Sequence, residues 1–125
     1  MAGSGLLLLL RAGDWAARAH AVTLALTAAA LGDRVVVALF DEALRSWVEG
    51  RFDEGATPAG RQAGMGSLSA LVDEGRRDLG LEVVACDTAI RLGGIDPGEA
   101  RRRLDGVRSL PELWRGAAGG RILAL

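Results

Sequence analysis

The chain has 125 residues, 50% of them apolar and 25% charged, which fits one folded domain and excludes a disordered chain. Its formal net charge is −1 and its 15 basic residues are all arginines, so it has no bulk attraction for nucleic-acid phosphates. A single cysteine excludes an internal disulfide and, with no secretory signal pattern, favours the cytoplasm.

The first part of the chain predicts a strand, a long helix, a second strand and a second helix. Residues 6–10 are all leucine, as expected of a parallel strand covered on both faces. Asp14 is placed to cap a long Ala-rich helix that Gly32 ends. Residues 34–40 predict the second strand, and the acidic pair 41–42 opens the next helix, where negative charge suits the helix dipole.

Residues 49–66 interrupt this pattern, because five glycines and a proline are scattered through them without periodicity. Loops of this length are uncommon in compact domains. Three interpretations stand open: a lid, a partner-binding segment or a disordered loop. We expect this segment to be the most mobile internal region of the chain.

The remaining residues alternate helices with short apolar runs. Asp96-Pro97 supplies an N-cap followed by a first-turn proline, and Ser109 with Glu112 forms a capping box. In chain order we predict a helix over 67–80, a strand over 81–86, a short helix to 92, a helix after Asp96, a strand over 106–108, a helix from 109 and a strand over 121–125.

Strands that alternate with helix-length segments favour parallel pairing with crossover helices. We therefore predict a single domain over residues 1–125, a three-layer α/β/α sandwich on a five-stranded, mostly parallel sheet. The longest mostly apolar stretch, residues 19–31, is too short and too polar to span a membrane. We expect no membrane segment.

In open parallel sheets, ligands bind beyond the carboxyl ends of the strands. That edge would carry residues 11–15, 40–42, 86–88 and 108–109, with Cys86 as its one nucleophile of interest. At a strand-to-helix junction, free backbone N–H groups and the helix dipole favour a thiolate. Asp87 opposes this effect because it is negatively charged. The alternative is that Cys86 is a small buried core residue.

Other chemistries lack the residues that they need. His20, the one histidine, lies on the polar stripe of the first helix and away from the carboxyl edge, so we expect a surface residue. No Cys/His cluster could hold zinc, and no glycine pattern of a phosphate or dinucleotide loop is present. The run Arg101-Arg102-Arg103 predicts a solvated face balanced by Glu99 and Asp105. We expect no metal and no cofactor.

A family resemblance follows from the arrangement around the cysteine. Residues 83–95, VVACDTAIRLGGI, are similar to an apolar strand, Ala-Cys, short helix and Gly-Ile pattern. The first half, with its apolar strand, Ala-rich helix ending in Gly32-Asp33 and Val-rich strand, agrees in outline. The chain thus resembles the DsrE/DsrF-like family, which includes TusD-type sulfur-relay subunits, over nearly its whole length.

The resemblance implies a sulfur carrier or sulfurtransferase in which Cys86 accepts a persulfide sulfur and passes it on. Its partners would be sulfur donor and acceptor proteins or small thiols, and the chain would form a homo-oligomer, a dimer or trimer. The alternative is a non-catalytic module of the same fold that binds a small ligand or a protein. A thiol peroxidase would need an external thiol, because no resolving cysteine is present. We expect an accessible Cys86 thiol.

Overall fold

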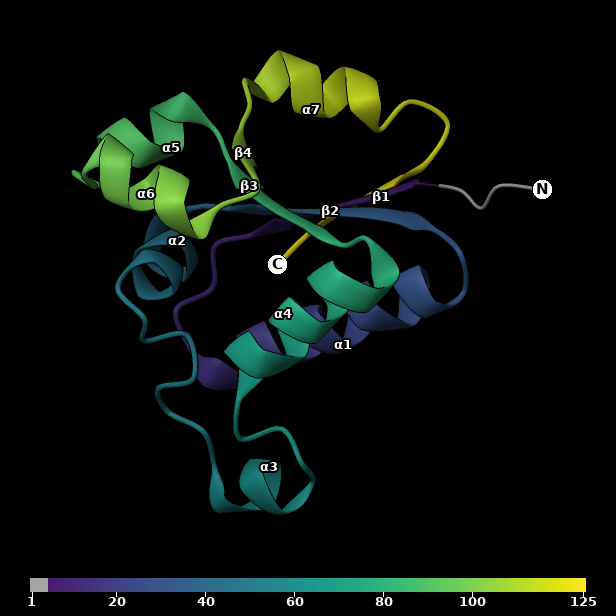
Figure 1. Cartoon of the computed structure of the whole chain (residues 1–125), viewed down its shortest axis with the longest axis vertical. Helices are drawn as coiled ribbons and strands as arrows, with labels where there is room; N and C mark the ends of the chain where they lie inside the picture. The colour runs from purple at the N-terminus through teal and green to yellow at the C-terminus, as the bar shows by residue number, and fades with distance from the viewer. Residues whose placement is uncertain (1–4) are drawn as a thin grey trace.

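The computed structural model describes residues 5–125 and contains one all-parallel sheet of five strands in the order β4-β3-β2-β1-β5. The predicted three-layer α/β/α class is confirmed (Figure 1). The strands are β1 (Gly5–Leu10), β2 (Arg34–Leu39), β3 (Glu82–Ala85), β4 (Gly106–Val107) and β5 (Arg121–Ala124).

The helices lie on both sides of this sheet. Figure 1 shows α1 and α4 on one face, α7 on the other, and α2, α5 and α6 beside the end where β1 to β3 finish. Their bounds are α1 (Trp15–Ala30), α2 (Asp41–Val48), α3 (Pro58–Gln62), α4 (Leu68–Leu79), α5 (Asp87–Leu92), α6 (Pro97–Arg103) and α7 (Leu110–Gly116). None of the helices within residues 5–125 has the length and apolarity to cross a bilayer.

The predicted caps form as their residue types dictate. The Asp14 carboxylate accepts the Ala17 N–H at 3.2 Å and begins α1. Ser109 and Glu112 close the capping box of α7 with reciprocal bonds. Gly80 ends α4 with φ of 71°, a left-handed conformation that a residue without a Cβ adopts at no steric cost.

Residues 49–66 differ from the expectation of an irregular segment, because they contain the short helix α3. Thr57 caps α3 by accepting the Gly60 N–H at 2.9 Å, and Pro58 occupies its first turn. This N-cap and proline signal is present in the sequence, but the surrounding glycines hide any helical periodicity. The predicted mobility of the segment remains a prediction.

Two apolar clusters make up the core, one on each face of the sheet. The larger cluster fills the space between the sheet and α1, α2 and α4, and it includes Leu8, Leu10, Leu39 and Leu44. The smaller cluster lies under α7, where Leu113 and Ala117 cover residues of β1, β2 and β3. The second face is therefore covered by much less chain than the first.

Candidate functional site

The carboxyl ends of β1, β2 and β3 meet at one edge of the sheet, as predicted. In the β2–β3 register Ala38 lies level with Val84, so Phe40 and Cys86 follow at the same level. Asp41 and Asp87 then open α2 and α5 beside each other. The structure thus brings the chain segments around residues 40–42 and 86–88 together.

Cys86 is the N-cap residue of α5. Its backbone is extended, with φ of −92° and ψ of 156°, and its Sγ accepts the Ala89 N–H at 3.3 Å. The sulfur therefore lies at a helix N-terminus, where the backbone offers positive partial charge to an anion. The sequence-based placement of Cys86 at this strand-to-helix junction is confirmed.

The prediction of an accessible thiol is wrong for this structure. Cys86 is only 5% exposed and belongs to the larger core cluster. Ala89 and Ile90 of the same helix are also buried. The cause is tertiary: α2 packs against α5 and α6 at this end of the sheet. A reagent reaches Cys86 only when α5 or a neighbouring segment moves.

Asp41 holds an unusual backbone conformation at the same edge. Its φ is +48°, and it is the one non-glycine residue with positive φ among residues 5–125. Aspartate tolerates this region better than most residues, but the conformation still costs free energy and such positions cluster at functional sites. The strained residue thus lies two positions after β2, the strand that pairs with β3 just before Cys86.

An ion-pair network links α2 to the segment that follows it. Arg51 pairs with Glu42 at 3.3 Å, with Glu49 at 2.5 Å and with Glu54 at 3.5 Å. Hydrogen bonds to Glu49 and Glu42 raise the pKa of Arg51. The network is solvent-exposed, so its role is to orient these side chains rather than to stabilise the fold strongly.

Arg18 is the residue at this edge that sequence reasoning missed. It is 2% exposed, and its guanidinium donates to the carbonyls of Gly13, Phe52 (3.2 Å) and Glu54 (2.6 Å). Its Cζ also lies 5.5 Å from the centre of the Phe52 ring. Burial lowers the pKa of Arg18, while the carboxylates of Asp14, Glu42 and Glu54 oppose that shift.

Only the folded chain reveals this role, because the three carbonyls come from distant or irregular segments. In the sequence, Arg18 is one charged residue in an Ala-rich helix. The one available signal was that a charge at position 18 interrupts the apolar face that Ala21, Val22 and Ala25 continue. Buried arginines of this kind are retained where their donors are fully used.

The segment 49–66 lies over the start of α1. A Cβ built on Gly60 would stand 2.3 Å from Cη2 of Trp15, so α3 rests directly on the indole. Among residues 5–125, no group accepts a hydrogen bond from the buried Trp15 Nε1. Asp53 accepts from Ser69 N at 2.8 Å and from the Ser69 hydroxyl at 2.8 Å, and so ties the segment to α4.

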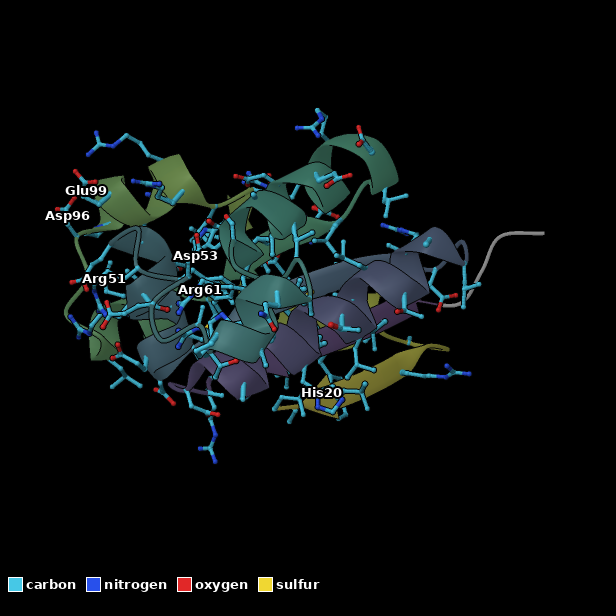
Figure 2. The ribbon with its side chains drawn as sticks, turned by 90° about the horizontal axis from the view of Figure 1, so that it is seen from below. His20, Arg51, Asp53, Arg61, Asp96 and Glu99 are labelled. Carbon is cyan, nitrogen blue, oxygen red and sulfur yellow. The ribbon has the colours of Figure 1, made fainter. Side chains whose placement is uncertain are left out.

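The remaining predicted candidates lie outside this edge or serve structure. His20 is exposed on α1 and points outward, as predicted (Figure 2). Arg102 pairs with Glu99 as expected, but Asp105 pairs with Arg76 at 2.7 Å instead of with the arginine run. The His, Cys, Asp and Glu side chains of residues 5–125 nowhere converge in threes.

The comparisons with known proteins bear on the fold. No protein-family model and no curated protein matches the chain. A solved structure of MTH1491 from Methanobacterium thermoautotrophicum, described as a protein of unknown function, superposes with a TM-score of 0.63 at 12% identity. The match covers 98% of this chain and 100% of that one. At this identity the likeness shows that the two chains share a fold, and the resemblance to the DsrE/DsrF-like family remains a prediction.

Proposed function

We propose that the protein is a sulfur carrier that takes up and passes on a persulfide sulfur at Cys86. The observation that supports this most directly is the position of the Cys86 Sγ, which accepts a backbone N–H at the start of α5. A thiolate or a persulfide anion gains from such a donor and from the helix dipole. Cys86 is the only thiol in the chain, so uptake and release occur at one atom.

The chemistry is two successive displacements at sulfur. The Cys86 thiolate attacks the outer sulfur of a donor R–S–S–H, so that a bond forms between the Cys86 sulfur and that outer sulfur while the S–S bond of the donor breaks. R–S⁻ leaves, and Cys86 becomes the persulfide Cys–S–S–H. An acceptor thiolate then attacks the outer sulfur and restores the Cys86 thiolate. Each step exchanges one S–S bond for another with no net oxidation or reduction, so neither step requires a redox cofactor.

The burial of Cys86 adds a requirement to this proposal. A donor reaches the sulfur only after α5 or a neighbouring segment moves away from the core. The Ala89 N–H contact lies within the first turn of α5, so a movement of α5 as a unit keeps it. Helix α5 has six residues and buries two of them, so its local opening costs less than unfolding of the sheet. Uptake of sulfur should therefore be slow in the free chain and faster with a partner that displaces α5.

Intact-mass measurement tests the proposal. The native chain is incubated with glutathione persulfide, and we expect one added sulfur atom that dithiothreitol removes. Cys86→Ser should take up none, and it keeps an oxygen that can cap α5, so its fold serves as a matched control. A native wild-type chain that adds no sulfur, while the urea-unfolded chain does, would contradict a role in sulfur transfer.

The second candidate is a non-catalytic binding module, which the burial of Cys86 favours. A groove of about 350 Å³ lies between α7 and the sheet. Its floor includes Val36 and Leu113, and Arg34, Arg108 and Glu112 stand around it. Arg108 already pairs with Glu82, so an apolar floor beside the Arg34 guanidinium is what suits a small carboxylate ligand. Benzoate should then raise the melting temperature of the wild type more than that of Arg34→Gln, and equal shifts would reject the groove as the site.

We further infer the setting of the sulfur carrier from composition and resemblance. Its partners are sulfur donor and acceptor proteins or small thiols, not nucleic acid or a membrane. A cytoplasmic location fits a single free thiol. A homo-oligomer, a dimer or trimer, fits a small chain in which half of the residues are apolar.

A further inference from the structure

Strand β5 is the sheet's edge strand on the side of β1, and among residues 5–125 neither a proline in the strand nor a covering helix protects its outer side. All four of its residues are exposed. Edge strands in stable monomers are blunted by prolines, inward charges or covering helices. Here the one charged residue is Arg121, and Ile122 and Leu123 are 38% and 39% exposed.

The hydrogen-bond pattern shows which backbone groups face outward. Leu125 donates to the Leu9 carbonyl at 2.8 Å and accepts from Arg11 N–H at 2.9 Å, so both its polar groups point to β1. Residues alternate along a parallel strand, and Leu123 therefore also points its backbone groups to β1. The N–H and C=O groups of Ile122 and Ala124 point away from the sheet.

Helix α7 extends this edge on one face of the sheet. Leu113 and Ala117 form the buried side of α7. On one flank of that side, Glu112 and Gly116 border the groove between α7 and the sheet, together with Arg34 and Arg108. The other flank carries Leu110 and Trp114, exposed by 52% and 67%. That flank lies on the β1 and β5 side of the helix. We define the β5 surface by its five exposed apolar residues, Leu110, Trp114, Ile122, Leu123 and Leu125.

The size of the β5 surface matches what a stable dimer needs. With full side-chain areas of about 180 Å² for Leu and Ile and about 250 Å² for Trp, the exposed fractions of these residues leave at most about 450 Å² of apolar area. Leu110, Trp114 and Ile122 contribute it on the α7 side of the sheet, and Leu123 and Leu125 contribute it on the α1 side. A standard interface buries about 800 Å² per partner, of which about 57% is apolar. Those fractions require about 450 Å² of apolar surface from each copy.

We propose that a second copy of this chain pairs with β5 across a two-fold axis at Leu123, which joins the two sheets into one. The antiparallel pair then places Ile122 opposite Ala124 of the second copy, and their outward N–H and C=O groups bond to each other in both directions. Leu123 meets its own equivalent as a non-hydrogen-bonded pair, with close side chains. Arg121 lies opposite Leu125, so the pairing brings no like charges together.

The same axis gives a reason for the exposure of Trp114 on the surface of the single chain. Ile122 lies level with Leu7, which faces α7, and therefore projects to the α7 side of the sheet. In the dimer the two copies of Trp114 stand above the joined β5 strands and shelter Ile122 from water. This inference extends the expected homo-oligomer, selects the dimer over the trimer and is independent of the chemistry of Cys86.

Light scattering on the full chain tests the assembly. At tens of micromolar we expect twice the chain mass of 13.0 kDa for the wild type. Leu123→Asp should weaken the dimer at least tenfold, because it places two carboxylates side by side. The matched control is Leu92→Asp, which changes an 81% exposed leucine on α5 and should leave the dimer intact. A monomeric or trimeric wild type, or a Leu123→Asp variant as dimeric as Leu92→Asp, overturns the proposal.

Disulfide trapping tests the axis itself. Non-hydrogen-bonded antiparallel pairs have Cα atoms about 4.5 Å apart, within the range that a disulfide spans. In a Cys86→Ser background, Leu123→Cys should cross-link under mild oxidation, and Leu92→Cys should not. Cys86→Ser alone should stay dimeric while it takes up no sulfur, so failure of the dimer and failure of sulfur transfer are separate results. A cross-link at Leu92 equal to that at Leu123 contradicts the axis.

Discussion

At the scale of single residues, Arg18 and Cys86 show how burial changes the role of a side chain. Arg18 is a charged residue that the fold uses as a buried clamp on three carbonyls. Cys86 is a thiol that the fold buries at a helix N-terminus, where its sulfur accepts a backbone N–H. In both cases the polar atoms are satisfied by the backbone, which is the condition for burying them.

Removing the Arg18 guanidinium should destabilise the protein strongly. Arg18→Met keeps most of the volume but leaves the carbonyls of Gly13, Phe52 and Glu54 without their donor, so we expect a loss of about 2–4 kcal/mol in the free energy of unfolding. Urea denaturation measures it. Arg11→Met, on an exposed side chain, should change stability by less than about 0.5 kcal/mol. Equal effects of the two substitutions would show that Arg18 is no clamp.

At the scale of elements, short helices hold the two ends of the molecule. The α3 segment rests on Trp15, and α7 is the one helix of the smaller cluster. Each is a few turns at most, and such helices owe their stability to caps and tertiary contacts. Changes at a cap or a contact point should therefore show up locally before the whole fold is lost.

Gly60→Ala should detach α3 from the start of α1. The new methyl group would overlap the Trp15 ring, at 2.3 Å from Cη2, so α3 or the indole must shift. We expect faster tryptic cleavage after Arg61, measured by mass spectrometry. Gly116→Ala is the matched control, because nothing lies within 4 Å of the added methyl group and helix propensity should stabilise α7 by up to about 1 kcal/mol. Unchanged cleavage in Gly60→Ala would disprove the contact.

The capping box of α7 should contribute to stability in a pH-dependent way. Hydrogen bonds from the Ser109 N–H and hydroxyl lower the pKa of Glu112 from its ordinary value of 4.5. Since the folded pKa is the lower one, the contribution is fully present above about pH 4.5 and is lost as the pH falls through the folded pKa.

Melting temperatures between pH 2 and pH 7 check this sign. Glu112→Gln keeps an acceptor oxygen but loses the charge, so its melting temperature should fall less steeply than that of the wild type below about pH 4.5. Glu74→Gln removes an exposed carboxylate on α4 and should follow the wild-type curve. If the melting temperatures of the wild type and of Glu112→Gln fall equally steeply below about pH 4.5, the capping box makes no pH-dependent contribution to stability.

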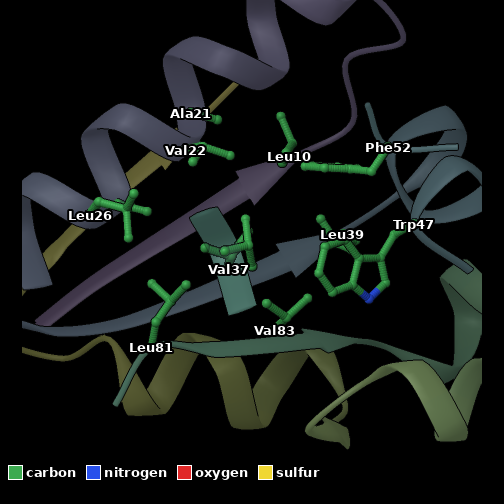
Figure 3. A pocket seen from close by; sticks show the side chains of 12 residues that line it. Leu10, Ala21, Val22, Leu26, Val37, Leu39, Trp47, Phe52, Leu81 and Val83 are labelled. Atoms are coloured by element: carbon green, nitrogen blue, oxygen red, sulfur yellow. The ribbon is translucent and has the colours of Figure 1, made fainter. Parts of the chain in front are cut away.

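At the scale of the whole molecule, the two faces of the sheet are packed unequally. The larger cluster encloses an apolar cavity of about 20 Å³ between α1, α4 and the sheet, bordered by Val22, Val37 and Leu39 (Figure 3). A cavity with such a lining stays dry, because a water would find no polar partner in it. On the other face, Val84 is completely buried under α7.

This difference predicts opposite effects of the same substitution. Val22→Ile adds a methylene beside the cavity and should raise the free energy of unfolding by up to about 0.8 kcal/mol. Val84→Ile adds the same methylene to a filled site and should lower it by about 1–3 kcal/mol. Urea midpoints compare the two. Equal losses in both variants would show that the cavity does not accept the added group.

Local sequence determined the elements of this protein almost completely. The leucine and valine runs, the caps at Asp14, Ser67 and Ser109, and the stop at Gly80 act within a few residues, so the predicted order of strands and helices is confirmed. The place of Cys86 at the end of β3 is equally local. The short helix α3 was not predicted, because its N-cap and proline signal lies among glycines.

What these elements cover depends instead on how distant parts of the chain pack together. The strand order leaves β5 at an open edge, packing around α5 buries Cys86, and the segment after α2 brings two carbonyls to Arg18. Each of these three features depends on contacts between residues distant in sequence. Hydrophobic periodicity indicates which face of a helix or strand is apolar, but it does not indicate which other element packs against that face. Burial of a given side chain is therefore a property of the assembled layers, which is why the accessibility of Cys86 was predicted wrongly while its position was predicted correctly.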